Sequence, residues 1–228
     1  MRSISPCRVA VGSALLALSA VAAAAPTGYQ SQSDFAAAIA GMTAQTVDFE
    51  AVPSGTTFAS GTGTGGLTFV YDIPGYSLQV SSTFGTTSGT NYLGLDNPDT
   101  AFYLGDSFTI AFGRTVTAAG LYLIAGNDAE PGDLELSTAT ASVFNGTTPL
   151  VLSDGKAYFL GLVDGAGFDA MTITGVASGG AFLPFSADDI TSAVTSVPEP
   201  GMPVTMLAGL GLLAVLARRR LGVPSTRQ

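Results

Sequence analysis

The chain has 228 residues, a formal net charge of −9 at pH 7, a single cysteine and no histidine. This length accommodates one ordinary domain together with processing segments. The lack of histidine excludes histidine-based catalytic triads, imidazole general bases and zinc sites built on histidine.

The acidic residues are concentrated between Pro26 and Val197, where sixteen carboxylates accompany only two basic residues, Arg114 and Lys156. Such a surface repels phosphates and anionic lipid headgroups, so we expect neither nucleic acid nor an anionic lipid surface as a ligand. It attracts cations, calcium in particular, although solubility outside the cell explains the same charge.

Residues 1–24 are predicted to be a cleaved signal peptide. Two arginines form a positive n-region, an apolar stretch covers residues 9–21, and small alanines follow it. We expect cleavage after Ala24. Because Cys7 lies inside this segment, the mature protein is expected to have no disulfide and no cysteine metal ligand.

Residues 25–44 are expected to form a short helical lead-in to the domain. Phe35 and Ile39 are four residues apart and would share one face of a helix. Ser31 or Ser33 suits the N-cap, and a glycine follows at the C-terminal end. A helix of this length is not stable alone, so we expect it to dock on the domain.

Residues 45–195 show the pattern of short β-strands. Apolar and polar residues alternate in several runs, separated by turns rich in Gly, Asn, Asp and Pro; the clearest runs are 47–49, 67–71, 108–112 and 171–173. Period-two alternation is typical of antiparallel strands with one solvated face. The segment is therefore predicted to be all-β, folded as a jelly-roll-like antiparallel β-sandwich.

Two stretches of this segment depart from regular alternation. The apolar positions change parity between residues 134–136 and 139–143, which predicts a bulge or a sharp bend. Residues 54–66 are rich in glycine and threonine and are expected to form a long loop or an irregular sheet edge.

Two groups of acidic residues are candidates for a hard cation such as calcium. Glu50 ends an early strand, and Asp188 and Asp189 lie near the end of the last one. The first and last strands of a jelly roll are often neighbours, so these three carboxylates are expected to meet around a structural calcium ion. The second group lies within residues 127–135, where we favour a solvated turn.

Sugar binding by aromatic stacking is an alternative function for the domain, although the chain has no tryptophan. The candidate residues are Tyr71, Tyr76, Tyr92, Tyr103 and Tyr122. Most of them are expected to be ordinary sheet packing. Another alternative is a secreted hydrolase that uses a pair of carboxylates.

The C-terminus combines an extended segment, an apolar run and a basic cluster. Val197, Pro198, Glu199 and Pro200 cannot continue a strand or begin a helix, because each proline lacks an amide donor and restricts the residue before it. Residues 203–217 are expected to form a transmembrane helix close to the minimum length for a bilayer. The positive-inside rule keeps the basic cluster that follows, and the tail 221–228, in the cytoplasm. This cluster consists of Arg218, Arg219 and Arg220.

Residues 196–220 resemble the PEP-CTERM sorting signal of Gram-negative bacteria. VPEP, an apolar run containing GLGLL, and RRR follow each other in the order of that signal. The resemblance implies that an exosortase, a membrane-embedded protease, acts near Pro198-Glu199-Pro200. It also implies an inner-membrane-anchored precursor, a final place at the cell surface or in the extracellular matrix, and an association with exopolysaccharide or biofilm.

The middle of the chain is similar to β-sandwich ectodomains that occur ahead of this signal and are like carbohydrate-binding modules. The similar phrases are VDFE at 47–50, DSFTIAF at 106–112, TAAGL at 117–121, FLG at 159–161 and ADDI at 187–190. We therefore expect a non-enzymatic exported surface or matrix protein. The alternatives are a lectin-like module and, with less support, a carboxylate-dependent hydrolase.

Overall fold

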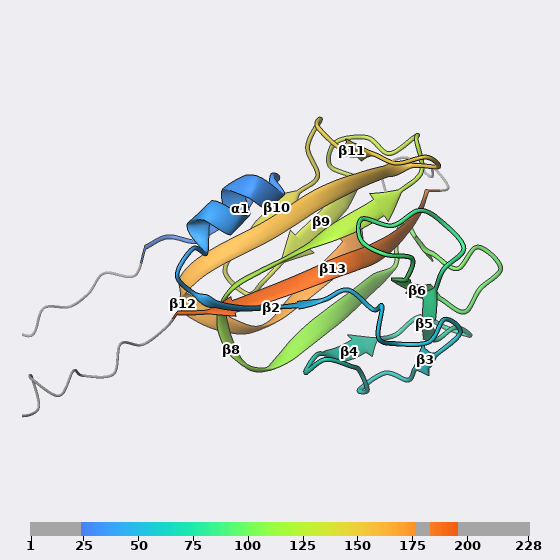
Figure 1. Cartoon of the computed structure of the whole chain (residues 1–228), viewed down its shortest axis with the longest axis horizontal. Coiled ribbons are helices and arrows are strands. Elements are labelled where there is room, and N and C mark those ends of the chain that lie inside the picture. Colours follow the sequence, from blue (N-terminus) through green and yellow to red (C-terminus); the bar gives the residue numbers. More distant parts are fainter. Residues whose placement is uncertain (1–23, 177–182, 196–228) are drawn as a thin grey trace, which may run out of the picture.

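The computed structural model describes residues 24–176 and 183–195, which form antiparallel β-structure and one short helix (Figure 1). The all-β prediction is confirmed. In chain order the elements are β1 (Thr27–Tyr29), α1 (Gln32–Ala38), β2 (Thr43–Val47), β3 (Thr57–Phe58), β4 (Thr68–Tyr71), β5 (Leu78–Ser81), β6 (Tyr92–Leu95), β7 (Phe102–Tyr103), β8 (Ser107–Ala125), β9 (Leu134–Ser137), β10 (Ser142–Phe144), β11 (Leu150–Val151), β12 (Lys156–Gly175) and β13 (Pro184–Val194).

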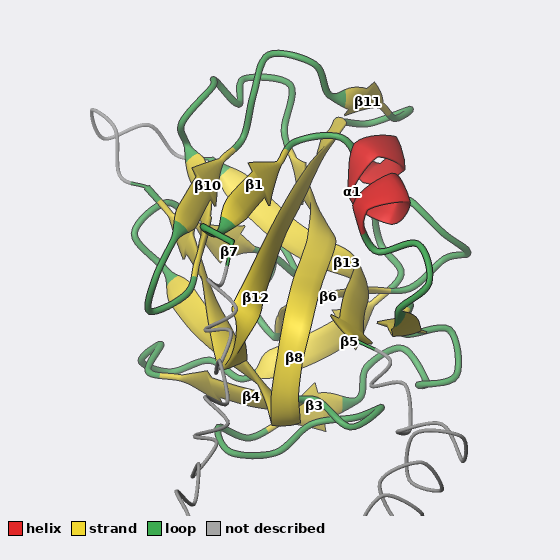
Figure 2. Ribbon diagram, turned by 90° about the vertical axis from the view of Figure 1, so that its left-hand side faces the viewer, coloured by secondary structure: helices red, strands yellow, loops and turns green. Residues whose placement is uncertain are grey.

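Strands β8 and β12 are the longest and run side by side through the domain (Figure 2). They pair antiparallel from Lys156 opposite Ala125 to Thr174 opposite Ser107. The first part of β8 also pairs with β4, and its second part pairs with β13. Strand β8 therefore changes its second partner along its length, from β4 to β13, while β12 stays on its other side.

Hydrogen bonding is continuous across the sheet, in the order β10-β9-β12-β8-β13-β6-β5-β3. The layers are thus connected through strands that pass between them, as happens where strands turn corners by bends and bulges. Register shifts in β12 between Val163, Phe168 and Ala170 mark one such corner. The main hydrophobic core lies inside this curved sheet and includes fully buried Phe69, Ile110 and Leu121.

The early strand that precedes Glu50 lies beside the last strand, as expected, because β2 pairs with β13 with Val47 opposite Ile190. The alternation that we extended to Phe49 is wrong at that residue. Phe49 is buried but has a φ of 62°, a left-handed backbone that ends the strand and begins a turn.

Two other irregular stretches take definite forms. The parity change after Leu136 marks a hairpin: β9 and β10 pair antiparallel, and the Thr138 amide donates to the Ala141 carbonyl across the turn. Residues 54–66 form an irregular sheet edge that contains the two-residue strand β3 and a single bridge between Thr62 and Phe69.

Helix α1 covers the outer face of the sheet above β12 (Figure 1). Ser31 is the N-cap, since its hydroxyl accepts the Asp34 amide at 3.3 Å. Phe35 is buried against Phe159, with 5.2 Å between ring centroids. Gly161 permits this approach, because a Cβ atom there would lie 2.7 Å from the Phe35 ring.

Helices with the length and apolarity needed to cross a bilayer are absent from residues 24–176 and 183–195. The transmembrane helix predicted at 203–217, the cytoplasmic tail at 221–228 and nearly all of the predicted signal peptide lie outside the described residues.

The docking of α1 predicts a large effect of Phe35→Ala. The substitution removes the one buried side chain of a seven-residue helix, so unfolding in urea should show a loss of about 3 kcal/mol. Phe144→Ala is the matched control, because Phe144 is 41% exposed and its removal should change stability by less than about 0.5 kcal/mol. Equal effects of the two substitutions would contradict the packing described here.

Candidate functional site

The three candidate carboxylates, Glu50, Asp188 and Asp189, all contact one loop, residues 87–91, which precedes β6. This loop has the sequence TSGTN and offers backbone amides and hydroxyl groups as donors. We call it the 87–91 loop. It was absent from our sequence-based expectations, although its run of hydroxyl side chains before β6 was the available indication.

Asp188 is completely buried on β13 and accepts hydrogen bonds through both oxygens. Its Oδ2 accepts the Thr87 amide at 3.1 Å, the Thr87 hydroxyl at 2.8 Å and the Ser88 amide at 3.2 Å. Its Oδ1 accepts the Asp189 amide at 2.8 Å. This carboxyl group therefore fixes the beginning of the 87–91 loop on the sheet.

Asp189 reaches the same loop because β13 bulges at this position. Successive side chains of a regular strand point to opposite faces, but Asp189 has a φ of 51°, and the register with β8 shifts between Asp188 and Thr191. The Asp189 carboxylate consequently accepts the Thr87 hydroxyl at 2.8 Å and the Ser88 hydroxyl at 2.7 Å.

Glu50 binds the other end of the loop from the turn that follows β2. Its Oε1 accepts the Thr90 amide at 2.8 Å and the Asn91 amide at 2.6 Å. These backbone donors, that of Asn91 first, lower the pKa of Glu50. The Asn91 side chain completes the connection by donating to the Phe49 carbonyl at 3.2 Å.

The Thr87 hydroxyl lies between the two aspartates, because its Oγ1 is 2.8 Å from Oδ2 of Asp188 and 2.8 Å from Oδ2 of Asp189. Burial, and then the negative charge of Asp189, raise the pKa of Asp188 to about 7. Tyr122, opposite Asp188 on β8, has its pKa raised by burial and by Asp189.

The three carboxylates do not form the metal site that we expected. Among residues 24–176 and 183–195, no three His, Cys, Asp or Glu side chains come together in a way that could hold a metal ion. Amides and hydroxyl groups of the 87–91 loop occupy the position that we assigned to calcium, on Asp188 and Asp189 at one end and on Glu50 at the other. Calcium binding stays a prediction from the sequence, for which the structure offers no preformed site.

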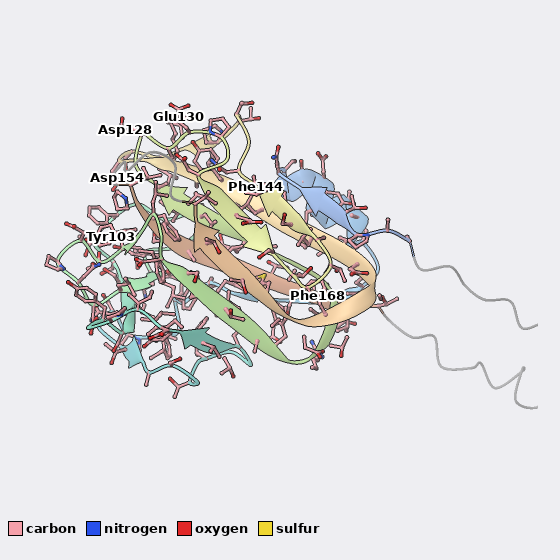
Figure 3. All side chains as sticks on the ribbon, turned by 180° about the vertical axis from the view of Figure 1, so that it is seen from behind. Tyr103, Asp128, Glu130, Phe144, Asp154 and Phe168 are labelled. Atoms are coloured by element: carbon pink, nitrogen blue, oxygen red, sulfur yellow. The ribbon has the colours of Figure 1, made fainter. Side chains whose placement is uncertain are left out.

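The second acidic group, residues 127–135, comprises a turn and the first two residues of β9. Asp133 is buried and accepts the Glu130 amide at 2.8 Å. Asn145, on the neighbouring segment, accepts the Gly132 amide at 2.9 Å. Asp128 and Glu130 lie at the same end of the domain as Asp154 (Figure 3). The described contacts of this turn are hydrogen bonds within the chain.

The five candidate tyrosines differ in their exposure. Tyr92 is completely buried in the core, and Tyr76 is 43% exposed. Tyr103 donates its hydroxyl to Asp99 at 2.6 Å, and burial together with this carboxylate raises the pKa of Tyr103 to about 12. Tyr122 packs against Phe159 with 5.3 Å between ring centroids. Of the five, Tyr76 is thus the most exposed.

The raised pKa of Asp188 predicts that the domain loses stability as the pH rises toward neutrality. Its usual pKa is 3.8 and its folded pKa is about 7, so the folded protein keeps a proton that the unfolded chain has already lost. The stability from this group is complete below about pH 4 and declines through pH 7, by on the order of 4 kcal/mol. Glu50 acts oppositely at lower pH, since its pKa is lowered in the folded state.

Urea unfolding of the full chain between pH 5 and pH 8 measures this decline. Asp189→Asn should move the decline to lower pH, because it removes the neighbouring charge and asparagine tolerates the left-handed backbone at this position. Asp188→Asn should abolish the decline. Asp154→Asn, at an exposed carboxylate that binds the Gly85 amide, should leave it unchanged. Identical profiles for the wild type and Asp188→Asn would contradict the prediction.

The predicted sorting signal, with Val197, Pro198, Glu199, Pro200 and the cluster Arg218, Arg219 and Arg220, lies outside the described residues. It begins at residue 196, two residues after the end of β13 at Val194.

Comparison with known families identifies this tail. The model of the PEP-CTERM protein-sorting motif matches residues 196–220, the same segment that the sequence analysis singled out. No curated protein and no solved structure matched the chain. The chain therefore carries a PEP-CTERM sorting motif and is an exported protein of Gram-negative bacteria, made as a membrane-passing precursor that an exosortase processes.

Proposed function

We propose that this protein is a non-enzymatic component of the cell surface or extracellular matrix, associated with exopolysaccharide. The observation that carries the proposal is the PEP-CTERM motif at residues 196–220, which begins two residues after the end of β13 at Val194. A β-domain with its own hydrophobic core thus precedes the sorting segment directly. Cleavage near Pro198-Glu199-Pro200 would separate the domain from the membrane without cutting a described strand.

The same proposal gives the apolar run at 203–217 the role of a temporary inner-membrane anchor. The cluster Arg218, Arg219 and Arg220 would hold its end in the cytoplasm. The domain would then stand outside the inner membrane until the exosortase acts. Its excess of carboxylates over basic residues favours a soluble, self-repelling particle in that compartment.

The hydrogen bonds of three carboxylates support a non-enzymatic role for the domain. Glu50, Asp188 and Asp189, the residues that a carboxylate-dependent hydrolase would most plainly use, accept hydrogen bonds from the 87–91 loop. They therefore hold a loop in place. Carbohydrate binding is the second candidate function, favoured by a cleft that Arg114 lines together with Gln45 and Ser192.

The sorting proposal predicts a defined C-terminus for the mature protein. In a host that has an exosortase, mass spectrometry of the surface-associated protein should show a chain that ends near Pro198-Glu199-Pro200. Replacing these three residues by alanine should leave the precursor uncut in the membrane fraction. Arg227→Gln lies beyond the motif and should be processed normally. Surface material that retains the intact arginine cluster would overturn the proposal.

A further inference from the structure

A cleft of about 290 Å³ opens where β8 bends between the two layers of the fold. It lies beside β2, next to the loop that leads into β4. Val47, Leu67 and Phe112 supply apolar walls, and the cleft is lined in addition by Gln45, Gly65, Gly66, Gly113, Arg114 and Ser192. Phe112 also packs against Phe168 of β12, with 6.0 Å between ring centroids, and Phe168 marks the same end of the domain in Figure 3.

Glycines with left-handed backbone shape this cleft. Gly113 has a φ of 62° at the bend of β8, directly before Arg114, and Gly65 has a φ of 60° on the opposite wall. Gly65 also lies close to Val47, because a Cβ atom there would be 2.6 Å from a Val47 methyl group. Such backbone is available to glycine at little cost. The bend therefore places the Arg114 side chain at a cleft that is lined in part by the main chain of glycine residues.

Arg114 is exposed, and its guanidinium has no hydrogen bond and no ion pair with any other residue in the described part of the chain. This is notable in a domain with so many carboxylates. The nearby Asp169 instead accepts the Thr115 hydroxyl at 2.6 Å. Lys156, the other basic residue of the domain, donates to the Asn127 carbonyl at 2.6 Å. The planar donors of Arg114 are therefore available to a ligand in the cleft.

The opposite wall offers groups that suit hydroxyls. The Gln45 Nε2 donates to the Gly65 carbonyl at 2.8 Å, so the Gln45 Oε1 is left to accept a hydrogen bond from a ligand. Ser192, on β13, is 7% exposed and lines the same cleft. A hydroxyl group both donates and accepts, so it can bond either side chain.

We propose that this cleft binds a carboxylate that belongs to a hydroxyl-bearing molecule, as in a sugar acid. The guanidinium of Arg114 binds the carboxylate with two parallel hydrogen bonds, the geometry for which arginine is best suited. Gln45 and Ser192 bind hydroxyl groups of the same molecule, and Val47 and Phe112 contact its carbon framework. A neutral sugar lacks the partner of Arg114, and a simple carboxylate lacks the partners of Gln45 and Ser192.

The ligand can be a free sugar acid or a uronate residue in a polysaccharide, since both present the same chemistry. The inference deepens the carbohydrate-binding candidate and does not depend on sorting. Binding is measured on the purified chain without an exosortase, so its failure would leave the sorting proposal intact, and the reverse also holds.

The test is calorimetric titration of the full chain in detergent with glucuronate, glucose, acetate and a glucuronate oligomer. Glucuronate should bind more tightly than glucose or acetate. Arg114→Gln should weaken glucuronate binding at least about tenfold, the usual effect of losing a charge-assisted hydrogen bond. The affinity of Arg114→Lys for glucuronate should lie between those of the wild type and Arg114→Gln. Lysine keeps the positive charge but cannot form two parallel hydrogen bonds with a carboxylate.

Lys156→Gln is the matched control, because it removes the other positive charge of the domain, away from the cleft, and should change the affinity less than twofold. Arg114 is exposed, so the variants should unfold at the temperature of the wild type. Tighter binding of the oligomer than of glucuronate would assign the cleft to a polysaccharide, and equal binding to a single sugar acid. No binding of glucuronate, equal binding of glucose, or an unchanged affinity in Arg114→Gln would overturn the proposal.

Discussion

The antiparallel pairing of β8 with β12 is the constraint on which the rest of the domain depends. The two strands remain paired from Lys156 opposite Ala125 to Thr174 opposite Ser107, and the other strands pair with them directly or are connected to them through β9 or β13. Because both strands bend, one continuous set of hydrogen bonds can enclose a hydrophobic core. The cleft lined by Arg114 lies at the bend of β8, where Gly113 has a left-handed backbone.

A bulge in β13 has a comparable effect at the other site. Burying Asp188 costs free energy, because a carboxylate loses its hydration. The left-handed backbone of Asp189 brings a second carboxyl group to the same hydroxyl of Thr87, and burial together with the charge of Asp189 raises the pKa of Asp188 to about 7. The 87–91 loop is thereby held to the last strand, and through Glu50 to the turn after β2. These contacts stabilise the domain and lie outside the sorting motif.

The alternation of apolar and polar residues located the strands that have one face buried and the other nearer to solvent, as in residues 108–112 of β8 and 171–173 of β12. It was wrong at Phe49, whose buried side chain is held by a left-handed turn, because burial fixes the side chain and leaves the backbone angle open. It also left open whether the parity change after Leu136 was a bulge, a bend or the hairpin that is observed. The three carboxylates of the candidate site contact the same loop, Asp188 and Asp189 at its beginning and Glu50 at its end, and this loop was missed by the sequence analysis.

The sorting motif was recognisable without a structure, because recognition of residues 196–220 depends on the order of a proline-rich block, an apolar run and arginines. The all-β class was equally accessible, because period-two patterning is local. The contacts of the polar side chains, in contrast, follow from the three-dimensional arrangement of the strands. Asp188 and Thr87 are about a hundred residues apart in the chain, and the cleft at Arg114 is assembled from β2, the loop before β4, β8 and β13. Contacts of such long range depend on bends and bulges, whose backbone angles are set by packing rather than by the residues that adopt them.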